Sequence, residues 1–420
     1  MPDFGAESVS GGAGRAYGPR YRWVVLAVGV AAQASFSAVF SGLSVTGVLL
    51  REAYRLSDVA LGLVLGCIAL GVFLSEILWG ALTDKLGDRR VLLTGLLSTG
   101  GLLGAMAVWV VPTPHHIPGP WLLGLSLVAV GLLSGSVNSS SGRAVMTWFS
   151  GAERGFAMSI RQTAIPAGGA LGAAIIPWIA RLDGFAPVYA LLAVLCGLSA
   201  WAVWRWLFEP APPENSPVAT VEARSPLLRI DVWRVALAGA LLTVPQFAVL
   251  TFAGVFLHDV HQVDVALGAA VVMTAQLGGG VLRIWSGRYT DRHHNRRTVV
   301  RAIGTLTGAA MLALTLVEAT GGGTIWLLLT LLCAAGLLAN AFHGVAYTEI
   351  AVMSGAGRAG TALGMIGMTM FGVGFLTPAV IPLLLAARSW GLVWAATAAA
   401  AFAAVAVCPA QHPKPARRKR

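Results

Sequence analysis

Long apolar stretches alternate with short polar ones along almost the whole chain. A helix that crosses a bilayer needs about 20 apolar residues, and twelve stretches approach or exceed that length. They lie at residues 23–49, 59–81, 91–111, 121–148, 157–180, 186–207, 232–257, 265–286, 298–318, 325–351, 361–385 and 391–408. The pattern therefore predicts an all-α membrane protein with twelve transmembrane helices.

A polar segment divides these spans into six and six. Residues 208–231 contain prolines at 210, 212, 213, 217 and 226, and such a proline-rich, polar segment stays extended or disordered. The predicted organisation has five parts: a cytoplasmic tail at 1–21, a six-helix bundle at 22–207, a cytoplasmic linker at 208–231, a second six-helix bundle at 232–408 and a basic cytoplasmic tail at 409–420.

The two halves repeat each other in sequence. The peptide DVALG occurs at residues 58–62 and again at 264–268, and residues 76–85 (EILWGALTDK) match residues 283–292 (RIWSGRYTDR). Both matches lie on the second predicted span of their half and the loop after it. Because order, spacing and topology agree, we expect two pseudo-symmetric six-helix bundles with a central site between them.

Composition excludes a soluble protein. The chain is 56% hydrophobic and 11% charged, whereas soluble domains carry roughly a quarter charged residues. No HExxH, GxSxG or GxxxxGK[ST] motif occurs, so the sequence predicts neither an enzyme nor a bound cofactor. The four cysteines form no CxxC pair, and His258 with His261 is interpreted as a polar cap rather than a metal site.

The basic residues indicate how the chain lies in the membrane. The formal charge is +11, but Lys and Arg do not cluster as a nucleic-acid-binding face would require. With the N-terminus inside, the outer loops hold only Arg51, Arg55, Arg181 and Arg388 of the 29 Lys and Arg residues. By the positive-inside rule, we expect both termini to be cytoplasmic. We also expect a multi-pass protein of the inner (plasma) membrane that functions as a monomer.

Residues 80–90 (GALTDKLGDRR) resemble the loop 2–3 motif of the major facilitator superfamily: Gly, three residues, Asp, a basic residue, then Gly and a basic pair. Residues 287–292 (GRYTDR), followed by Arg296 and Arg297, resemble a degenerate second copy, in which His293 and His294 replace an apolar residue and Gly. The resemblance spans residues 22 to 408. It implies alternating access by two rocking bundles.

This resemblance implies a gate that is latched in the outward-open state. Gly80 would let the second helix pack closely, and Asp84 would face the positive N-terminus of helix 11 as Asp291 would face that of helix 5. We expect Arg89 and Arg90 to pair with Glu153, and Arg296 or Arg297 to pair with Glu349; positive-inside anchoring is the alternative. The gating set is Gly80, Asp84, Arg89, Arg90, Gly287, Asp291, Arg292, Glu153 and Glu349.

The region of spans 4 and 5 narrows the resemblance. Residues 148–149 (WF), 153–155 (ERG) and 161–163 (RQT) resemble bacterial permeases for organic anions. Drug-efflux members carry an Arg early in span 4, where this chain has none, and a Gly-Pro-rich motif in span 5, of which residues 166–169 (PAGG) are an imperfect version. The sequence thus favours a transporter of a small organic anion, with proton-driven efflux of a drug or amphipathic metabolite as the alternative.

Charged residues inside spans need a partner or a purpose, because a charge in the bilayer is costly. Arg143 and Arg161 lie on consecutive antiparallel spans at a similar predicted depth, and two guanidinium groups suit a carboxylate or phosphate. The alternative is that one of them neutralises Glu76, which still leaves one cation over. Arg283, at the position equivalent to Glu76, is interpreted as structural.

Protonatable and uncharged polar groups complete the predicted site. Glu76 and His343 are the candidates for proton coupling. The alternative interpretation of His343 is a structural one, in which it is a hydrogen-bonded histidine of the interior. Buried amides need partners, which a substrate or neighbouring helices can supply. The amide candidates for substrate binding are Gln33, Asn138, Gln162, Gln246 and Gln276. A small solute, protons and the bilayer are the expected partners.

Overall fold

The computed structural model describes residues 9–11, 15–18, 20–209, 224–321, 323–387 and 389–411. Most of the predicted linker, most of the C-terminal tail and Arg388 lie outside the described residues. A two-stranded antiparallel hairpin, β1 (Val9–Gly11) and β2 (Arg15–Tyr17), precedes the helices and pairs Val9 with Tyr17.

All twelve predicted spans are confirmed as helices long and apolar enough to cross a membrane. The first half contains α1 (Tyr21–Val45), α2 (Gly47–Tyr54), α3 (Asp58–Leu86), α4 (Asp88–Trp109), α5 (Pro120–Ser134), α6 (Ser136–Trp148), α7 (Arg154–Asp183) and α8 (Phe185–Trp206). The second contains η1 (Pro226–Leu228), α9 (Ile230–His261), α10 (Val265–His293), α11 (Arg296–Thr320), α12 (Ile325–Ala341), α13 (His343–Ser354), η2 (Ala356–Arg358), α14 (Ala359–Ala387) and α15 (Trp390–Val407).

The repeated peptide DVALG marks the start of the second span in each half. In α3 the Ser57 hydroxyl accepts the Ala60 amide at 3.2 Å, and in α10 the Asp264 carboxylate accepts the Ala266 amide at 2.7 Å. A side-chain oxygen at this position satisfies an amide that has no partner within the helix. The cap lies one residue before the peptide in α3 and at its first residue in α10, so both copies of the peptide lie at the start of a helix.

Spans 4 and 10 are each broken into two helices at equivalent positions, between α5 and α6 and between α12 and α13. Backbone that leaves the helix inside a membrane needs other hydrogen-bond partners. The Trp79 indole on α3 donates to the carbonyl of Leu132 at 2.6 Å, and Ser286 on α10 donates to that of Ala341 at 2.9 Å. Trp79 and Ser286 occupy corresponding repeat positions, so each half supports its broken span from its own second span.

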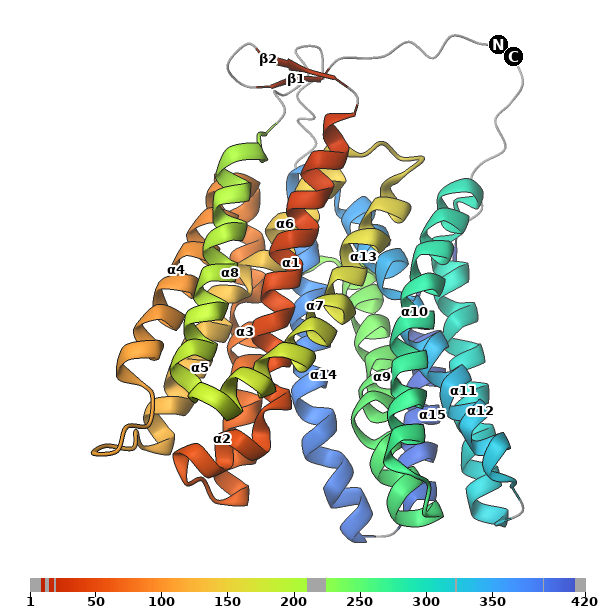
Figure 1. Cartoon of the computed structure of the whole chain (residues 1–420). Coiled ribbons are helices and arrows are strands. Elements are labelled where there is room, and N and C mark those ends of the chain that lie inside the picture. Colours follow the sequence, from red (N-terminus) through yellow and green to blue (C-terminus); the bar gives the residue numbers. More distant parts are fainter. Residues whose placement is uncertain are drawn as a thin grey trace, which may run out of the picture.

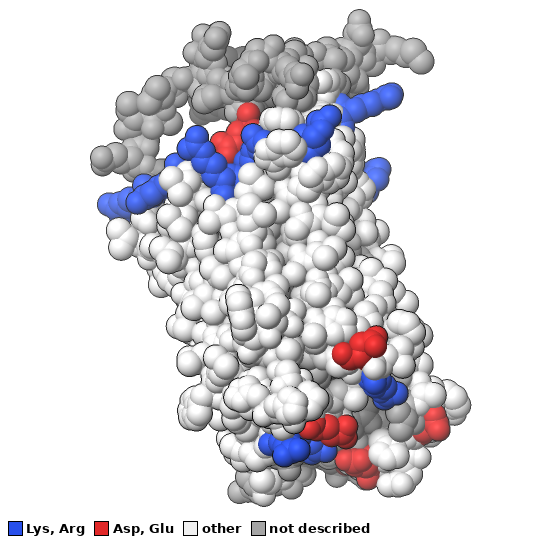
Figure 2. Space-filling model, turned by 60° about the vertical axis from the view of Figure 1, so that its left-hand side comes forward, with Lys and Arg blue, Asp and Glu red and all other residues white. Residues whose placement is uncertain are grey.

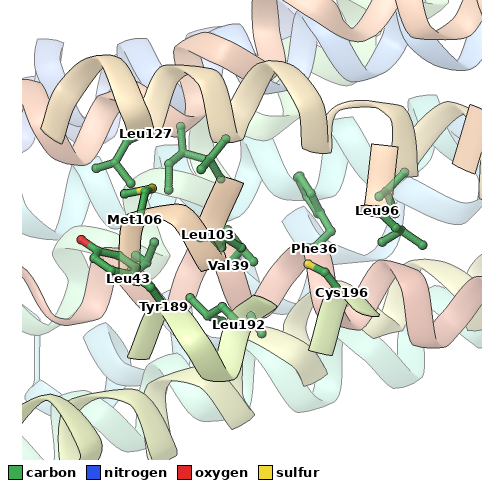
Figure 3. Packing of buried hydrophobic residues seen from close by; sticks show 14 of the residues in the cluster. Phe36, Val39, Leu43, Leu96, Leu103, Met106, Leu127, Tyr189, Leu192 and Cys196 are labelled. Carbon is green, nitrogen blue, oxygen red and sulfur yellow. The ribbon is translucent and has the colours of Figure 1, made fainter. Parts of the chain in front are cut away.

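Apolar side chains fill each bundle. In the first half, α1, α4, α5 and α8 contribute buried residues such as Leu43, Leu103 and Leu192, which Figure 3 shows pointing toward one another. In the second half, Phe256, Trp390 and Trp394 pack their rings together at centroid distances of 5.2 to 5.7 Å. Figure 1 shows the first half on the side of α4 and α8 and the second on that of α11 and α15.

The two bundles meet along α3 with α14 and along α7 with α10. Glycines allow these close contacts: a side chain on Gly80 would collide with the carbonyl of Gly360, and one on Gly287 would collide with the carbonyl of Gly155. All four glycines lie toward the end of the molecule where α1 begins, here called the terminus side. The described contacts hold the bundles together on that side.

The charged residues at the surface lie at the two ends of the molecule. Figure 2 shows Lys and Arg gathered at the terminus side, an almost uncharged middle band, and Asp and Glu with fewer basic residues at the opposite end. Large apolar side chains are exposed on the helices, among them Trp201, Leu277 and Trp285. Such a band suits the hydrocarbon of a bilayer.

Candidate functional site

A buried chain of hydrogen bonds joins four polar side chains of the first half, here called the N-half network. Arg161 on α7 donates to the Gln33 carbonyl oxygen at 2.5 Å, Gln33 on α1 donates to that of Asn138 at 2.8 Å, and Asn138 on α6 donates to the carboxylate of Glu76 on α3 at 2.6 Å. Each residue is at most 1% exposed. The network therefore links a cation to an anion through two amides.

Serines of α6 complete this network. The Ser139 hydroxyl donates to the second carboxylate oxygen of Glu76 at 3.2 Å, and the Ser141 hydroxyl accepts from Arg161 at 2.9 Å. Arg161 also donates to the main-chain carbonyl of Asn138 at 2.7 Å. Sequence reasoning missed both serines, although the polar run at residues 138–141 (NSSS) inside an apolar span was a visible signal.

The second half has its own cluster, here called the C-half network. Arg283 on α10 donates to the main-chain carbonyl of Asn340 at 3.0 Å and lies 3.3 Å from the imidazole of His343. Gln246 on α9 donates to the Asn340 side chain at 2.8 Å. Arg283 also donates across the bundle interface to the carbonyl of Gln162, the residue after Arg161, at 2.7 Å.

Three buried charged groups thus lie at the centre of the molecule. Arg161, Arg283 and Glu76 are 0 to 2% exposed, and the Tyr347 hydroxyl on α13 interacts electrostatically with all three. Glu76 and Arg283 hold the same position in the repeat but carry opposite charges. No carboxylate of the described residues forms an ion pair with Arg161 or Arg283. The centre therefore has more positive than negative charge.

Two predicted binding residues lie elsewhere. Arg143 does not join Arg161, because its guanidinium pairs with Asp88 at 2.7 Å and with Asp84 at 3.3 Å near the terminus side. The prediction that Arg143 and Arg161 form one anion site is therefore wrong: equal depth on neighbouring helices did not fix the directions of the side chains. Gln276 is half-buried on α10 and belongs to neither network.

The Asp84 carboxylate closes the bundle interface between α3 and α14. It accepts the main-chain amides of Gly360 and Thr361 at 2.8 and 2.7 Å, and the Thr361 hydroxyl at 2.6 Å. These amides belong to the first turn of a long helix, where the dipole favours an anion. We call this contact the first latch.

A second latch joins α10 to α7 in the same way. The Asp291 carboxylate accepts the amides of Gly155 and Phe156 at 2.9 and 2.8 Å, and it pairs with Arg296 at 3.1 Å. Asp84 and Asp291 hold equivalent repeat positions, and each reaches the N-terminus of a helix in the other bundle. The contacts that the resemblance implied for both aspartates are present.

Some basic residues near the gate make the expected ion pairs and others do not. Arg297 pairs with Glu349 at 2.6 Å, as expected. The expected pairing of Arg89 or Arg90 with Glu153 is wrong, because Glu153 pairs with Arg22 at 2.6 Å.

Arg89 instead donates to the main-chain carbonyl of Trp204 at 2.6 Å, while Arg90 and Arg292 are exposed. The reason is that α4, which begins at the loop after α3, packs against α8, so Arg89 faces its own bundle.

No cluster of three His, Cys, Asp or Glu side chains that could hold a metal occurs within the described residues. His261 pairs with Glu318 at 3.3 Å, and His258 lies 3.2 Å from the carbonyl of Val263. These two histidines cap helix ends at the side opposite the termini, which agrees with their interpretation as polar caps.

Comparison with known families agrees with this geometry. The family profile described as Major Facilitator Superfamily matches residues 24–325. The chain belongs to the major facilitator superfamily. An uncharacterized MFS-type transporter of Mycobacterium tuberculosis is 30% identical over 389 residues, which cover 92% of this chain and 85% of the relative. This superfamily member is thus a multi-pass membrane transporter and not an enzyme.

Other relatives match shorter segments. The probable sulfoacetate transporter SauU of Cupriavidus necator is 27% identical over 186 residues, covering 43% of this chain and 40% of that protein. The multidrug resistance protein MdtH of Cronobacter sakazakii is 34% identical over 130 residues, covering 30% of each chain. The solved proton:xylose symporter XylE superposes with a TM-score of 0.75 at 15% identity, covering 94% of this chain and 97% of XylE, and so shares the fold.

Proposed function

We propose that this superfamily member moves a small organic anion together with protons across the inner (plasma) membrane by alternating access. The observation that carries the proposal is the central excess of positive charge: two buried guanidinium groups, Arg161 and Arg283, accompany the single carboxylate of Glu76. A buried cation without an ionic partner is costly. A bound anion would supply that partner, and guanidinium groups suit carboxylates and sulfonates through paired hydrogen bonds.

Proton coupling follows from the same three charges. While Glu76 is ionised, the centre carries one net positive charge, and a proton on Glu76 leaves both arginines uncompensated. The attraction for an anion then rises, and by linkage a bound anion favours protonation to the same degree. Glu76 is therefore the proposed proton carrier. His343 serves as a hydrogen-bonded neighbour of Arg283 in this proposal.

The two latches support the direction of access. With both termini cytoplasmic, as the basic residues of the terminus side favour, the latched side is the cytoplasmic gate, which is closed in the described conformation. Opening this gate would break the contacts of Asp84 and Asp291 together. The bundles would then rock about their shared interface, which is the usual motion of transporters built from repeats.

A thermal-shift experiment on the purified full-length protein tests the proposal. The panel is acetate, sulfoacetate, nitrate, glucose 6-phosphate and the lipophilic cation tetraphenylphosphonium, each at several pH values. A ligand at a hundredfold excess over its Kd stabilises the folded state by about 2.7 kcal/mol. We expect stabilisation by one anion class, stronger at acidic pH, that is lost in Arg161→Gln and Arg283→Gln.

The matched control is Arg143→Gln, which removes a guanidinium from the latch region and should leave anion stabilisation intact. The partial relative SauU favours an anion, whereas the partial relative MdtH favours efflux of drugs. Stabilisation by tetraphenylphosphonium alone, lost in Glu76→Gln, would replace the proposal by proton-driven efflux.

A further inference from the structure

The N-half network has a geometry that does more than fill a polar interior. Its three hydrogen bonds, of 2.5, 2.8 and 2.6 Å, run in sequence from Arg161 through Gln33 and Asn138 to Glu76. They connect α7, α1, α6 and α3, and all four side chains are at most 1% exposed. Bonds in such a dry site polarise one another, so a change at one end is felt at the other.

The direction of this chain is fixed by chemistry. A guanidinium has only donors, so Gln33 must turn its oxygen toward Arg161 and its NH2 group toward Asn138. Asn138 must then accept through its oxygen and donate through its NH2 group to Glu76. If either amide flipped, its NH2 group would face another hydrogen-bond donor in a buried site. The carboxylate oxygen Oε1 of Glu76 is therefore always an acceptor.

A proton on Glu76 must accordingly occupy its other oxygen, Oε2. That oxygen lies 3.2 Å from the Ser139 hydroxyl, which can also accept. The face of α14 against Glu76 is bare glycine, since a methyl group on Gly367 would lie 2.7 Å from the carboxyl carbon. The titratable or charged groups that interact with Glu76 are Arg161 and Tyr347.

We propose that the amides of Gln33 and Asn138 are positioning residues that transmit the charge state of Glu76 to Arg161. A hydrogen bond to a carboxylate is about twice as strong as one to a neutral acid. Protonation of Glu76 therefore weakens the whole chain and loosens the hold of Gln33 on Arg161. The guanidinium keeps its bonds to Ser141 and to the Asn138 carbonyl but becomes more available to an anion. The biological role rests on the proposed anion–proton coupling, but the relay itself exists without substrate.

The C-half network shows why only one half carries a relay. Gln246 and Arg283 both donate to the side-chain oxygen of Asn340, at 2.8 and 3.4 Å. Polarisation of the Asn340 amide by these two donors has no titratable group to reach. The Asn340 NH2 group ends on the main-chain carbonyl of Gly336 at 2.9 Å rather than on a carboxylate.

Infrared titration of the full-length protein without any added substrate tests the relay. The carboxyl stretching band of protonated Glu76 is assigned by its loss in Glu76→Gln, and its intensity is followed against pH. Gln33→Met keeps the length of the side chain, removes both hydrogen bonds and does not touch Glu76. We expect it to move the midpoint of the Glu76 titration by about half a pH unit or more.

A double-variant comparison separates transmission from packing. Gln33→Met and Asn138→Leu cut the same chain, so the double variant should titrate as Asn138→Leu alone does. Ser199→Ala is the control, because it removes a buried 2.7 Å hydrogen bond between α1 and α8 that lies outside the network. It should leave the midpoint where it is in the parent protein.

Gln33→Leu stands in if Gln33→Met does not fold. A Gln33 variant that titrates as the parent does, or a double variant whose shift is the sum of the two single shifts, would overturn the relay. A shifted midpoint in a protein that binds no anion of the panel would leave the relay standing and remove the proposed anion transport. The two proposals can therefore fail separately.

Discussion

Asp84→Asn tests the first latch with the smallest change in shape. The carboxylate accepts two main-chain amides and one hydroxyl at 2.6 to 2.8 Å, and it lies 3.3 Å from the Arg143 guanidinium. An asparagine keeps one accepting oxygen, but its NH2 group then faces an amide donor. Closure on the terminus side therefore loses at least one charge-assisted hydrogen bond and the attraction of the carboxylate for the helix N-terminus.

The magnitude follows from these contacts. A hydrogen bond to a charged group contributes about 1.5–3 kcal/mol, and the helix-end interaction adds about 0.5 kcal/mol or more. A loss of about 2–3 kcal/mol shifts an equilibrium by about 30- to 150-fold. A closed state populated a hundred times more than the open one would then become a mixture. Arg143 keeps its 2.7 Å contact with Asp88, so the fold itself is expected to persist.

Double electron–electron resonance measures this shift directly. Spin labels on the exposed residues Arg90 and Ala356 report the separation of the two bundles at the terminus side. We expect a longer-distance population in Asp84→Asn and none in Asp183→Asn, which neutralises an exposed carboxylate at the other end of α7. Distance distributions of Asp84→Asn that superimpose on those of the parent would refute the latch.

The other predictions use the same structure. Asp291→Asn should open the terminus side less than Asp84→Asn does, because Asp291 accepts two donors from the other half and Asp84 accepts three; Arg296 belongs to the same half as Asp291. The same spin labels measure the difference. Gly80→Ala should abolish the closed state and transport in proteoliposomes, since its methyl group would collide with the main-chain carbonyl of Gly360. Gly101→Ala is the control, because open space surrounds Gly101, and it should leave transport unchanged. Equal transport by the two variants would contradict the packing argument. Arg143→Gln should change the balance between open and closed terminus sides by no more than about fivefold, because its ion pairs with Asp84 and Asp88 lie within the first half. Anion binding measured by thermal shift should persist, and a loss of binding would return Arg143 to the site.

Residue patterns predicted the elements well because span formation rests on local chemistry. Twelve apolar stretches needed only the thickness of a bilayer to be recognised. The contacts of Asp84 and Asp291 were implied by the resemblance of residues 80–90 and 287–292 to the loop 2–3 motif, with the helix dipole as their physical reason. The breaks in spans 4 and 10 were not predicted, because Gly135 and Phe342 lie in runs that read as continuous helix. Near these breaks the carbonyls of Leu132 and Ala341 accept from Trp79 and Ser286, which are distant in sequence.

Side-chain partners across helices were the main failure. Arg143 and Arg161 have the same charge and a similar predicted depth, yet one reaches Asp88 and the other Gln33. Depth along a span can be counted from the sequence, whereas the direction of a side chain around a helix matters only once the neighbouring helix is placed. Arg283 was interpreted as structural from the resemblance, and it lies in the central cluster with Tyr347 and the backbone of Gln162.

The sequence by itself determined that this protein has twelve spans of repeated design, because span length and repeat spacing can be read along one chain, and its loop motif indicated the transporter family by resemblance. Only the tertiary structure decided which buried charges meet. Hydrogen-bond partners are chosen by angle and distance within a few ångströms, and no pattern along one helix contains the position of the next.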